Sequence, residues 1–143
     1  TADLGRLKVE AGAGRLRALN PHVAVETFPQ RLTQANAAEV VGGFDLALDG
    51  TDDFDTRLLV NRACVEAGKP LVSGALGRWS GQVGVFAGRP CYQCLVPETP
   101  PDAETCARVG VVGALAGVIG GAVYGLGVAP QGMGAASTLL VTR

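Results

Sequence analysis

Three carboxylates stand close together at the end of a short apolar run. The run Phe44–Asp49 reads FDLALD, and Asp52 and Asp53 follow it after Gly-Thr. Open α/β sheets bind ligands at the carboxyl ends of their strands, and Mg²⁺ prefers carboxylate oxygens. The spacing therefore fits a site for Mg²⁺ and phosphate. An aspartate between a strand and a helix also suits the N-cap of that helix, so the residue types leave both roles open.

Arg57 and Asn61 stand four residues apart in the segment that follows the carboxylates. On a helix they share one face, which points back toward the preceding turn. A guanidinium binds phosphate in a bidentate fork, and an asparagine can orient it. The alternative is a solvated helix face on which Arg57 pairs with Asp53.

Cys91 and Cys94 form a C-x-x-C motif, the spacing of half a zinc site. A structural zinc ion needs four ligands, and no second pair follows before Arg143. A redox pair is the alternative, but we do not expect this motif to open a helix as a thioredoxin-like motif does.

Cys106 lies in the polar segment 104–108, directly before a Gly-rich apolar stretch. A nearby helix N-terminus together with Arg108 would lower the pKa of the Cys106 thiol and favour the nucleophilic thiolate. The alternative is an inert core cysteine, although the polar surroundings favour exposure.

Alternating helices and strands must position these groups. Helices are predicted over residues 6–19, 33–41 (with Thr33 as N-cap), 55–67 and 109–129, and strands over residues 23–28, 44–49, 71–76, 82–87 and 138–142. The alternation predicts parallel β-α-β units. The short connection between the strands near residues 71 and 82 predicts an antiparallel pair. The fold class is therefore α/β, with a mixed, mainly parallel sheet flanked by helices.

Composition narrows the classes of function. The chain has 143 residues, 48% of them hydrophobic, and a net charge of −1, which indicates one globular domain. No basic stripe is present, so no nucleic-acid partner is expected. Residues 109–129 carry no charge and are long enough to span a bilayer, but their many glycines favour a buried helix in the core or at a dimer interface. No secretory signal precedes the cysteines, so a cytoplasmic location is expected.

Several short motifs also occur in an order and spacing that resemble those of a known family. They are Gly5-Arg-Leu-Lys8, Leu19-Asn-Pro21, Asp49-Gly-Thr-Asp-Asp53, the set Arg57, Asn61 and Cys64, Gly68–Val72, Gly81-Gln-Val83, Pro90–Cys94, Thr105-Cys106, Gly110-Val111 and Gly117–Gly120. Over residues 5–125 the chain resembles the ThiF/MoeB/HesA adenylyltransferases, relatives of the ubiquitin-activating enzymes. The resemblance implies a Rossmann-like fold, with residues 1–143 as one incomplete domain of this type.

The resemblance also implies a reaction. Members use ATP and Mg²⁺ to adenylate the terminal glycine of a small ubiquitin-like sulfur-carrier protein, in molybdopterin or thiazole synthesis, and a homodimer is expected. The implied nucleotide and metal ligands are Lys8, Asp49 and Asp52, supported by Arg57 and Asn61. Asp52 and Cys106 are the implied catalytic residues, with Cys106 serving a thioester or persulfide step. Cys91 and Cys94 would be half of a structural Zn²⁺ site.

The chain departs from the family pattern at several points. Asp53 replaces asparagine, Leu7 replaces proline, and the Gly-rich nucleotide loop, an upstream arginine motif and the second C-x-x-C are absent. Residue 1 is threonine, so we expect a longer natural protein. A non-catalytic member or fragment, kept for dimerisation or carrier binding, is the alternative function. A nicotinamide dehydrogenase is disfavoured because no G-x-G-x-x-G follows a strand.

Overall fold

The structure, a computed structural model, describes residues 3–99, 110–128 and 138–141. Contacts divide the chain into two compact units, one up to Leu32 and one from Thr33 onward. Each unit is described by itself.

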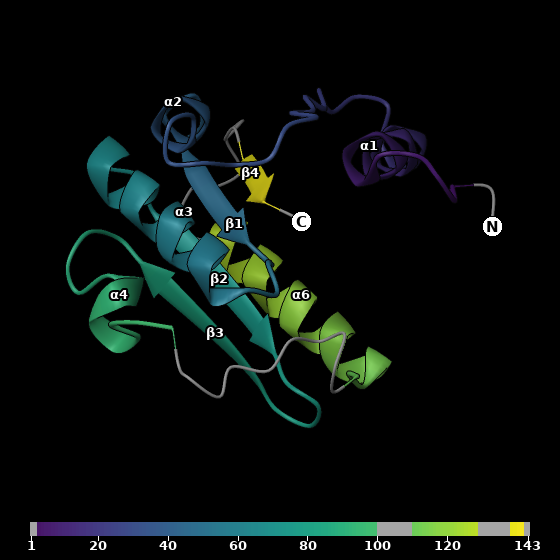
Figure 1. The fold of residues 1–143 in the computed structure, drawn as a ribbon. Coiled ribbons are helices and arrows are strands. Elements are labelled where there is room, and N and C mark those ends of the chain that lie inside the picture. Colours follow the sequence, from purple (N-terminus) through teal and green to yellow (C-terminus); the bar gives the residue numbers. More distant parts are fainter. Residues whose placement is uncertain (1–2, 100–109, 129–137, 142–143) are drawn as a thin grey trace. The chain divides into compact units, whose positions relative to one another are not determined.

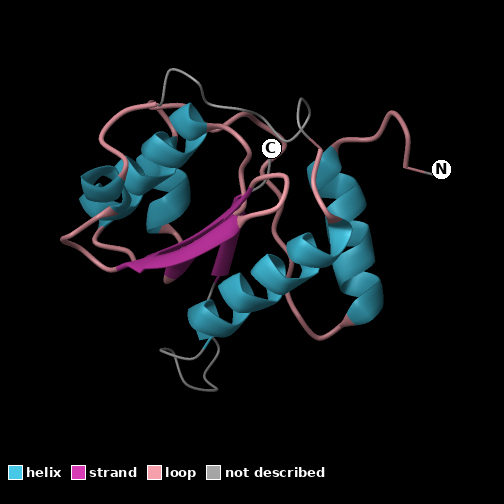
Figure 2. Cartoon of the chain, turned by 90° about the horizontal axis from the view of Figure 1, so that it is seen from below, coloured by secondary structure: helices cyan, strands magenta, loops and turns pink. Residues whose placement is uncertain are grey.

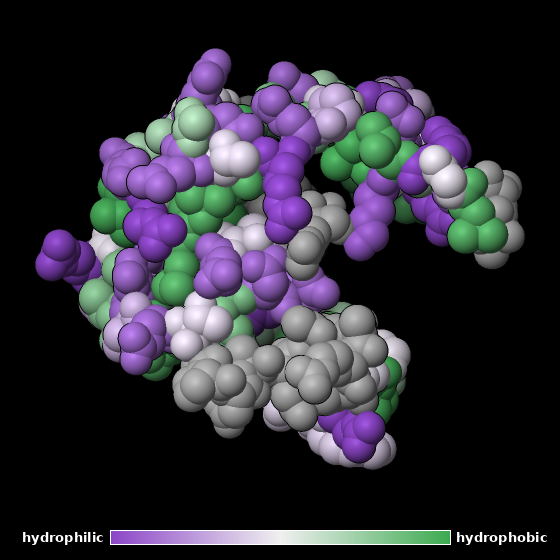
Figure 3. Space-filling model, viewed as in Figure 1, coloured by the Kyte–Doolittle hydropathy of each residue, from purple (hydrophilic) through white to green (hydrophobic). Residues whose placement is uncertain are grey.

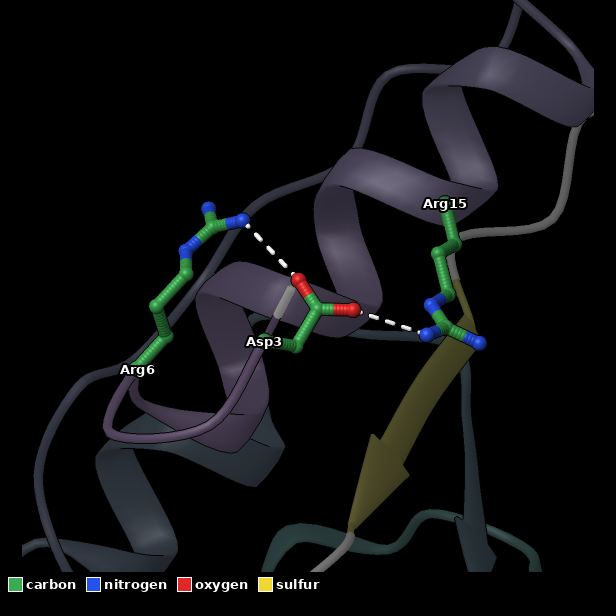
Figure 4. A network of polar contacts seen from close by, with 3 residues as sticks. All are labelled: Asp3, Arg6 and Arg15. Carbon is green, nitrogen blue, oxygen red and sulfur yellow. Dashed lines mark hydrogen bonds and ion pairs between the residues drawn. The ribbon is translucent and has the colours of Figure 1, made fainter. Parts of the chain in front are cut away.

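The first unit contains helix α1, Lys8–Leu19, which confirms the helix predicted over residues 6–19. It ends at Asn20 because the residue before a proline is pushed out of the α region. Asp3 lies between two arginines (Figure 4), at 3.1 Å from Arg6 and 2.7 Å from Arg15. The hydrogen bond from Arg15 is the main cause that lowers the pKa of Asp3. The contact with Arg15 ties the segment before α1 to the middle of the helix.

The strand predicted over residues 23–28 is wrong, because the structure has no regular secondary structure there. The backbone carbonyl of Val25 accepts a hydrogen bond of 2.6 Å from the Arg17 guanidinium. Among the described residues of this unit α1 is the one regular element, so the unit offers residues 23–28 no partner strand. An alternating pattern makes a strand only where another strand takes up its backbone groups.

The second unit is built on a four-stranded sheet of order β3-β2-β1-β4 (Figure 1). Strand β1 (Leu46–Asp49) lies between β2 (Leu71–Leu76) and β4 (Thr138–Val141) and is parallel to both. Strand β3 (Gly81–Phe86) pairs with β2 in antiparallel fashion. The α/β fold class and the mixed, mainly parallel sheet are therefore confirmed.

Helices cover both faces of this sheet (Figures 1 and 2). Helix α3 (Phe54–Ala67) lies on one face, where it contacts the short helices α2 (Ala37–Gly42) and α4 (Tyr92–Leu95). Helix α6 (Gly113–Val128) packs against β1, β2 and β3 from the other face. The connection from β1 to β2 thus runs through α3 on one face, whereas β4, on the other flank of β1, follows α6 on the opposite face. Such a strand marks the place where doubly wound sheets bind ligands.

The two ends of α3 follow the capping rules. Asp53 is the N-cap, and its side chain accepts a hydrogen bond from the backbone N–H of Thr56. Gly68 closes the helix with a φ of 64°, in the left-handed region that glycine adopts at low cost.

The sequence predicts Thr33 as the N-cap of α2, and this prediction is wrong, because Asn36 occupies that position. The backbone carbonyl of Thr33 accepts bonds from the N–H groups of Asn36 and Ala37. A separate turn therefore precedes the helix, which begins at Ala37.

The core between the sheet and α6 consists of short apolar side chains, which are Leu46, Leu48, Val72 and Val123, with Val83 and Ile119 packed against them. A Cβ atom placed on Gly74 of β2 would lie 2.5 Å from Cγ2 of Val123, and one on Gly127 would lie 2.8 Å from Cδ2 of Leu48. Glycine at these two positions therefore sets how closely α6 approaches the sheet.

Of the buried helix predicted over residues 109–129, the structure has a helix at Gly113–Val128 that packs on the sheet through one face only, so the helix as a whole is not buried. On its other face Val118 is 67% exposed and Tyr124 is 66% exposed. The face seen in Figure 3, over α2 and α3, instead mixes hydrophobic and hydrophilic residues. Among the described helices, none combines the length and the apolar character needed to cross a membrane.

The close approach of α6 yields a stability prediction. Gly74→Ala should lower the free energy of unfolding by about 1–3 kcal/mol, because the new methyl group overpacks the contact with Val123. Gly121→Ala in α6 is the matched control, since a Cβ there meets nothing within 4 Å. It should raise stability by up to about 1 kcal/mol through helix propensity. Urea unfolding measures both, and equal effects of the two variants would contradict the packing explanation.

Candidate functional site

Asp49 ends the central strand with its carboxylate fully buried. Its Oδ1 atom accepts hydrogen bonds from the backbone N–H of Thr51 at 2.9 Å and from the Thr51 hydroxyl at 2.8 Å. Its Oδ2 atom accepts one from the hydroxyl of Ser73, its register partner on β2, at 3.2 Å. Burial raises the pKa of Asp49, and these hydrogen bonds together with the Arg57 charge oppose that rise. Asp49 thereby fixes the shape of the turn that follows β1.

Arg57 is also buried, and it holds the same turn from the side of α3. Its Nε atom donates to the backbone carbonyl of Thr51 at 3.0 Å, and a terminal nitrogen donates to the same oxygen. The guanidinium lies over the ring of Phe54, 5.4 Å from its centroid, at cation–π distance. Arg57 is thus directed toward the backbone of residues 49–53, which we call the carboxylate turn.

Asp52 and Asp53 differ in what their side chains do. Asp53 caps α3, and its two carboxylate oxygens accept from the N–H and the hydroxyl of Thr56, at 2.9 and 2.7 Å. Asp52 is partly exposed, and among the described residues its side chain makes no hydrogen bond or ion pair. The capping role that the sequence left open thus belongs to Asp53, and the Asp52 carboxylate stays available to a ligand.

Asn61 does not join Arg57 at the carboxylate turn but contacts the C-x-x-C turn. Its Oδ1 atom accepts the backbone N–H of Tyr92 at 2.9 Å, and its Nδ2 atom donates to Cys91 Sγ at 3.6 Å. Asn61 is almost completely buried. The two residues predicted to act together are therefore directed toward two different turns.

The C-x-x-C motif forms a tight turn at the start of a helix. Cys91 is the N-cap of the four-residue helix α4, contrary to the expectation that the motif opens no helix. The N–H of Cys94 bonds to the Cys91 carbonyl at 3.0 Å, which brings Cys91 Sγ and Cys94 Sγ to 3.7 Å. Hydrogen bonding, first of all from Asn61, lowers the pKa of Cys91. Both thiols are free, and the described residues hold no group of three or more His, Cys, Asp or Glu around a common point.

Two further residues, Lys8 and Cys106, are predicted to take part in the site. Lys8 is the first residue of α1 and belongs to the separate N-terminal unit. Cys106 lies outside the described residues. Sequence reasoning missed Thr51 and Ser73, which satisfy Asp49. The Asp-x-Thr spacing could have revealed Thr51, but nothing local points to Ser73 on another strand.

Cys64 supplies a pH-dependent prediction. Burial, with the charge of Asp49 as a smaller cause, raises the pKa of the Cys64 thiol to about 12, so this thiol stays protonated at pH 8. Because alkylation needs the thiolate, iodoacetamide should leave Cys64 unmodified in the folded chain while it labels the exposed Cys94. Mass spectrometry of peptides reads both sites, and denatured protein serves as the control. Equal labelling of Cys64 and Cys94 in folded protein would contradict this assignment.

Comparison with known proteins places this geometry in a family. The ThiF family matches residues 1–126. A sulfur carrier protein adenylyltransferase of Thermus thermophilus is 47% identical over 124 residues, which cover 80% of this chain and 46% of the relative. A SAMP-activating enzyme E1 of Haloferax volcanii is 42% identical over 118 residues, covering 80% and 44%. The adenylyltransferase and sulfurtransferase MOCS3 of Sus scrofa is 46% identical over 118 residues, covering 79% and 26%.

The matched region thus spans less than half the length of each of these relatives. The matched family region nevertheless takes in α1, the carboxylate turn, the C-x-x-C turn and most of α6. On this match, and on the α/β sheet that carries it, the chain belongs to the ThiF family.

Proposed function

We propose that this chain is the C-terminal part of an adenylyltransferase domain, which activates the terminal glycine of a small ubiquitin-like sulfur-carrier protein. The main support for this proposal is the 47% identity to a sulfur carrier protein adenylyltransferase. A supporting one is the carboxylate turn, which stands at the carboxyl end of the central parallel strand. Molybdopterin or thiazole synthesis is the proposed pathway, and residues 1–143 form one incomplete domain in this proposal.

The proposed reaction makes a poor electrophile reactive. The carrier's terminal carboxylate attacks the α-phosphate of ATP, pyrophosphate leaves, and the product is an acyl-adenylate with a good leaving group. In this scheme Lys8 binds phosphate and Cys106 can accept the activated acyl group as a nucleophile. Mg²⁺, when bound, offsets the negative charge that develops on the phosphates.

Asp52 is the proposed catalytic carboxylate of the turn. It is partly exposed, and its side chain is not committed to any described residue, whereas Asp49 is buried and Asp53 caps a helix. A carboxylate oxygen in that state suits a hard cation such as Mg²⁺. Asp49 and Arg57 then contribute by holding the turn in place, through Thr51.

The described cysteines fit half of the proposed Zn²⁺ site. Two thiolates about 2.3 Å from a tetrahedral zinc ion lie about 3.8 Å apart, and Cys91 Sγ and Cys94 Sγ lie 3.7 Å apart. A zinc ion there would have a structural role, and two further ligands would come from outside the described residues.

The exposed face of α6 supports the proposal of a homodimer. Val118, Tyr124 and Leu126 are 67%, 66% and 42% exposed on a helix without charged residues. Large apolar side chains left exposed on one helix suit a surface that a second copy of the chain covers.

A cytoplasmic location, predicted from the sequence, is also part of this proposal.

The adenylation proposal is tested at Asp52. In the protein that contains this chain, Asp52→Asn should reduce ATP–pyrophosphate exchange by at least ~10²-fold, the scale for one well-placed electrostatic group. Asp53→Asn is the matched control, because asparagine also caps helices well, so exchange should stay near the wild-type rate. Wild-type exchange in a folded Asp52→Asn protein would remove the catalytic assignment and favour the non-catalytic alternative.

The dimer proposal is tested by light scattering. The wild-type protein should have the mass of a dimer, and Val118→Asp with Tyr124→Ser should shift it to a monomer, because charge on an apolar interface is costly. Val65→Ser, at a 43% exposed position on α3, is the control and should leave the dimer intact. A monomeric wild-type protein would contradict the interface role.

A further inference from the structure

The side-chain amide of Asn61 links two parts of the chain that are about thirty residues apart. It projects from the middle of α3, and both of its partners belong to the C-x-x-C turn. Only 2% of Asn61 is exposed. A buried amide has to be satisfied by protein groups, and this one is satisfied by one backbone group and one sulfur of the same turn.

The two contacts fix different features of that turn. The bond from Tyr92 N–H to Asn61 Oδ1 satisfies a donor of the first helical turn, which has no partner within a helix. The bond from Asn61 Nδ2 to Cys91 Sγ orients the sulfur. On its other side the turn is held by the buried ring of Tyr92, which meets the ring of Phe86 on β3 edge-on at 5.6 Å. A four-residue helix is too short to hold its own shape, so these outside contacts set its geometry.

We infer that Asn61 is the positioning residue of the Cys91–Cys94 pair, and that it prepares the two sulfurs to bind one thiophilic divalent metal ion. The donor–sulfur contact leaves Cys91 Sγ close to Cys94 Sγ, at a separation that matches one edge of a tetrahedral thiolate site. An N–H donor to a metal-bound thiolate stabilises its negative charge and fixes its direction, as supporting groups around metal sites do. This inference rests on the proposed thiolate half-site, and it is independent of adenylation.

Titration with Cd²⁺ tests the inference, because this ion prefers thiolate ligands and gives a thiolate-to-metal charge-transfer absorption. The titration uses the complete protein. Cys94→Ser should abolish the absorption from the pair. Asn61→Asp should weaken Cd²⁺ binding by at least ~10-fold, because it keeps an acceptor for Tyr92 N–H and loses the donor to Cys91. Arg62→Ala, at the exposed neighbouring position on α3, should bind Cd²⁺ like the wild type.

Thermal unfolding of Asn61→Asp checks that the variant is folded. An NMR measurement on the wild type needs no variant at position 61. The side-chain amide resonances of Asn61 should shift when Cd²⁺ binds, and Cys91→Ser should abolish that shift.

The outcomes separate the two proposals. If the wild type shows no thiolate–Cd²⁺ absorption, both the half-site and the role of Asn61 are overturned. If the wild type binds Cd²⁺ but folded Asn61→Asp binds it equally well, or the Asn61 amide resonances do not respond, the positioning role alone is overturned. Neither result changes the expectation for ATP–pyrophosphate exchange.

Discussion

A carboxylate buried at the end of a central strand has to be satisfied from within the protein, and Asp49 imposes this requirement on the structure around it. The chain folds back so that the N–H and hydroxyl of Thr51 reach Oδ1, and β2 supplies the hydroxyl of Ser73. That fold leaves the Thr51 carbonyl to accept from Arg57. The guanidinium in turn sets the position of the first turns of α3. The placement of this helix therefore depends on one buried carboxyl group.

The magnitudes indicate which contacts matter most. Asp49 and Arg57 are both buried, and both bond to Thr51 rather than to each other. Removal of the partner of a buried polar group leaves that group unsatisfied, at a cost of about 1–3 kcal/mol. Burial still dominates at Asp49, because its pKa is raised in spite of the nearby cation and hydrogen bonds. The ion pairs of Asp3 are short as well, but water screens them, and exposed pairs contribute little. The buried network, rather than the surface pairs, defines the candidate site.

Local signals explain which parts of the fold could be predicted. Helix α3 was foreseeable because it begins at a capping aspartate and ends at Gly68 before a proline, and β2 because six apolar and small residues stand between turn signals. The local sequence pattern failed at residues 23–28, where alternating hydrophobic and polar residues predicted a strand but no partner strand is described. It could not reveal the partners of Asn61, because sequence spacing predicts the face of a helix but not the loop that packs on it. The glycines of α6 predicted close packing, but not that Gly74 on β2 would receive the side chain of Val123.

Arg57 and Asn61 on α3 contact two different turns, and this affects the proposed nucleotide site. Arg57 directs two of its donors to a backbone carbonyl, and Asn61 bonds to the C-x-x-C turn, so the phosphate contact that their spacing predicts stays a prediction. What the described turn offers an incoming ligand is the carboxylate of Asp52, beside that of Asp53. A triphosphate is repelled by these charges unless a cation lies between them, since at short range like charges in a partly buried site interact by several kcal/mol. In the proposed site, Asp52 would hold Mg²⁺, which would offset this repulsion, and Lys8 would add a further positive charge. In this proposal the carboxylate turn would take nucleotide as a metal complex, and its affinity for ATP without Mg²⁺ would be low.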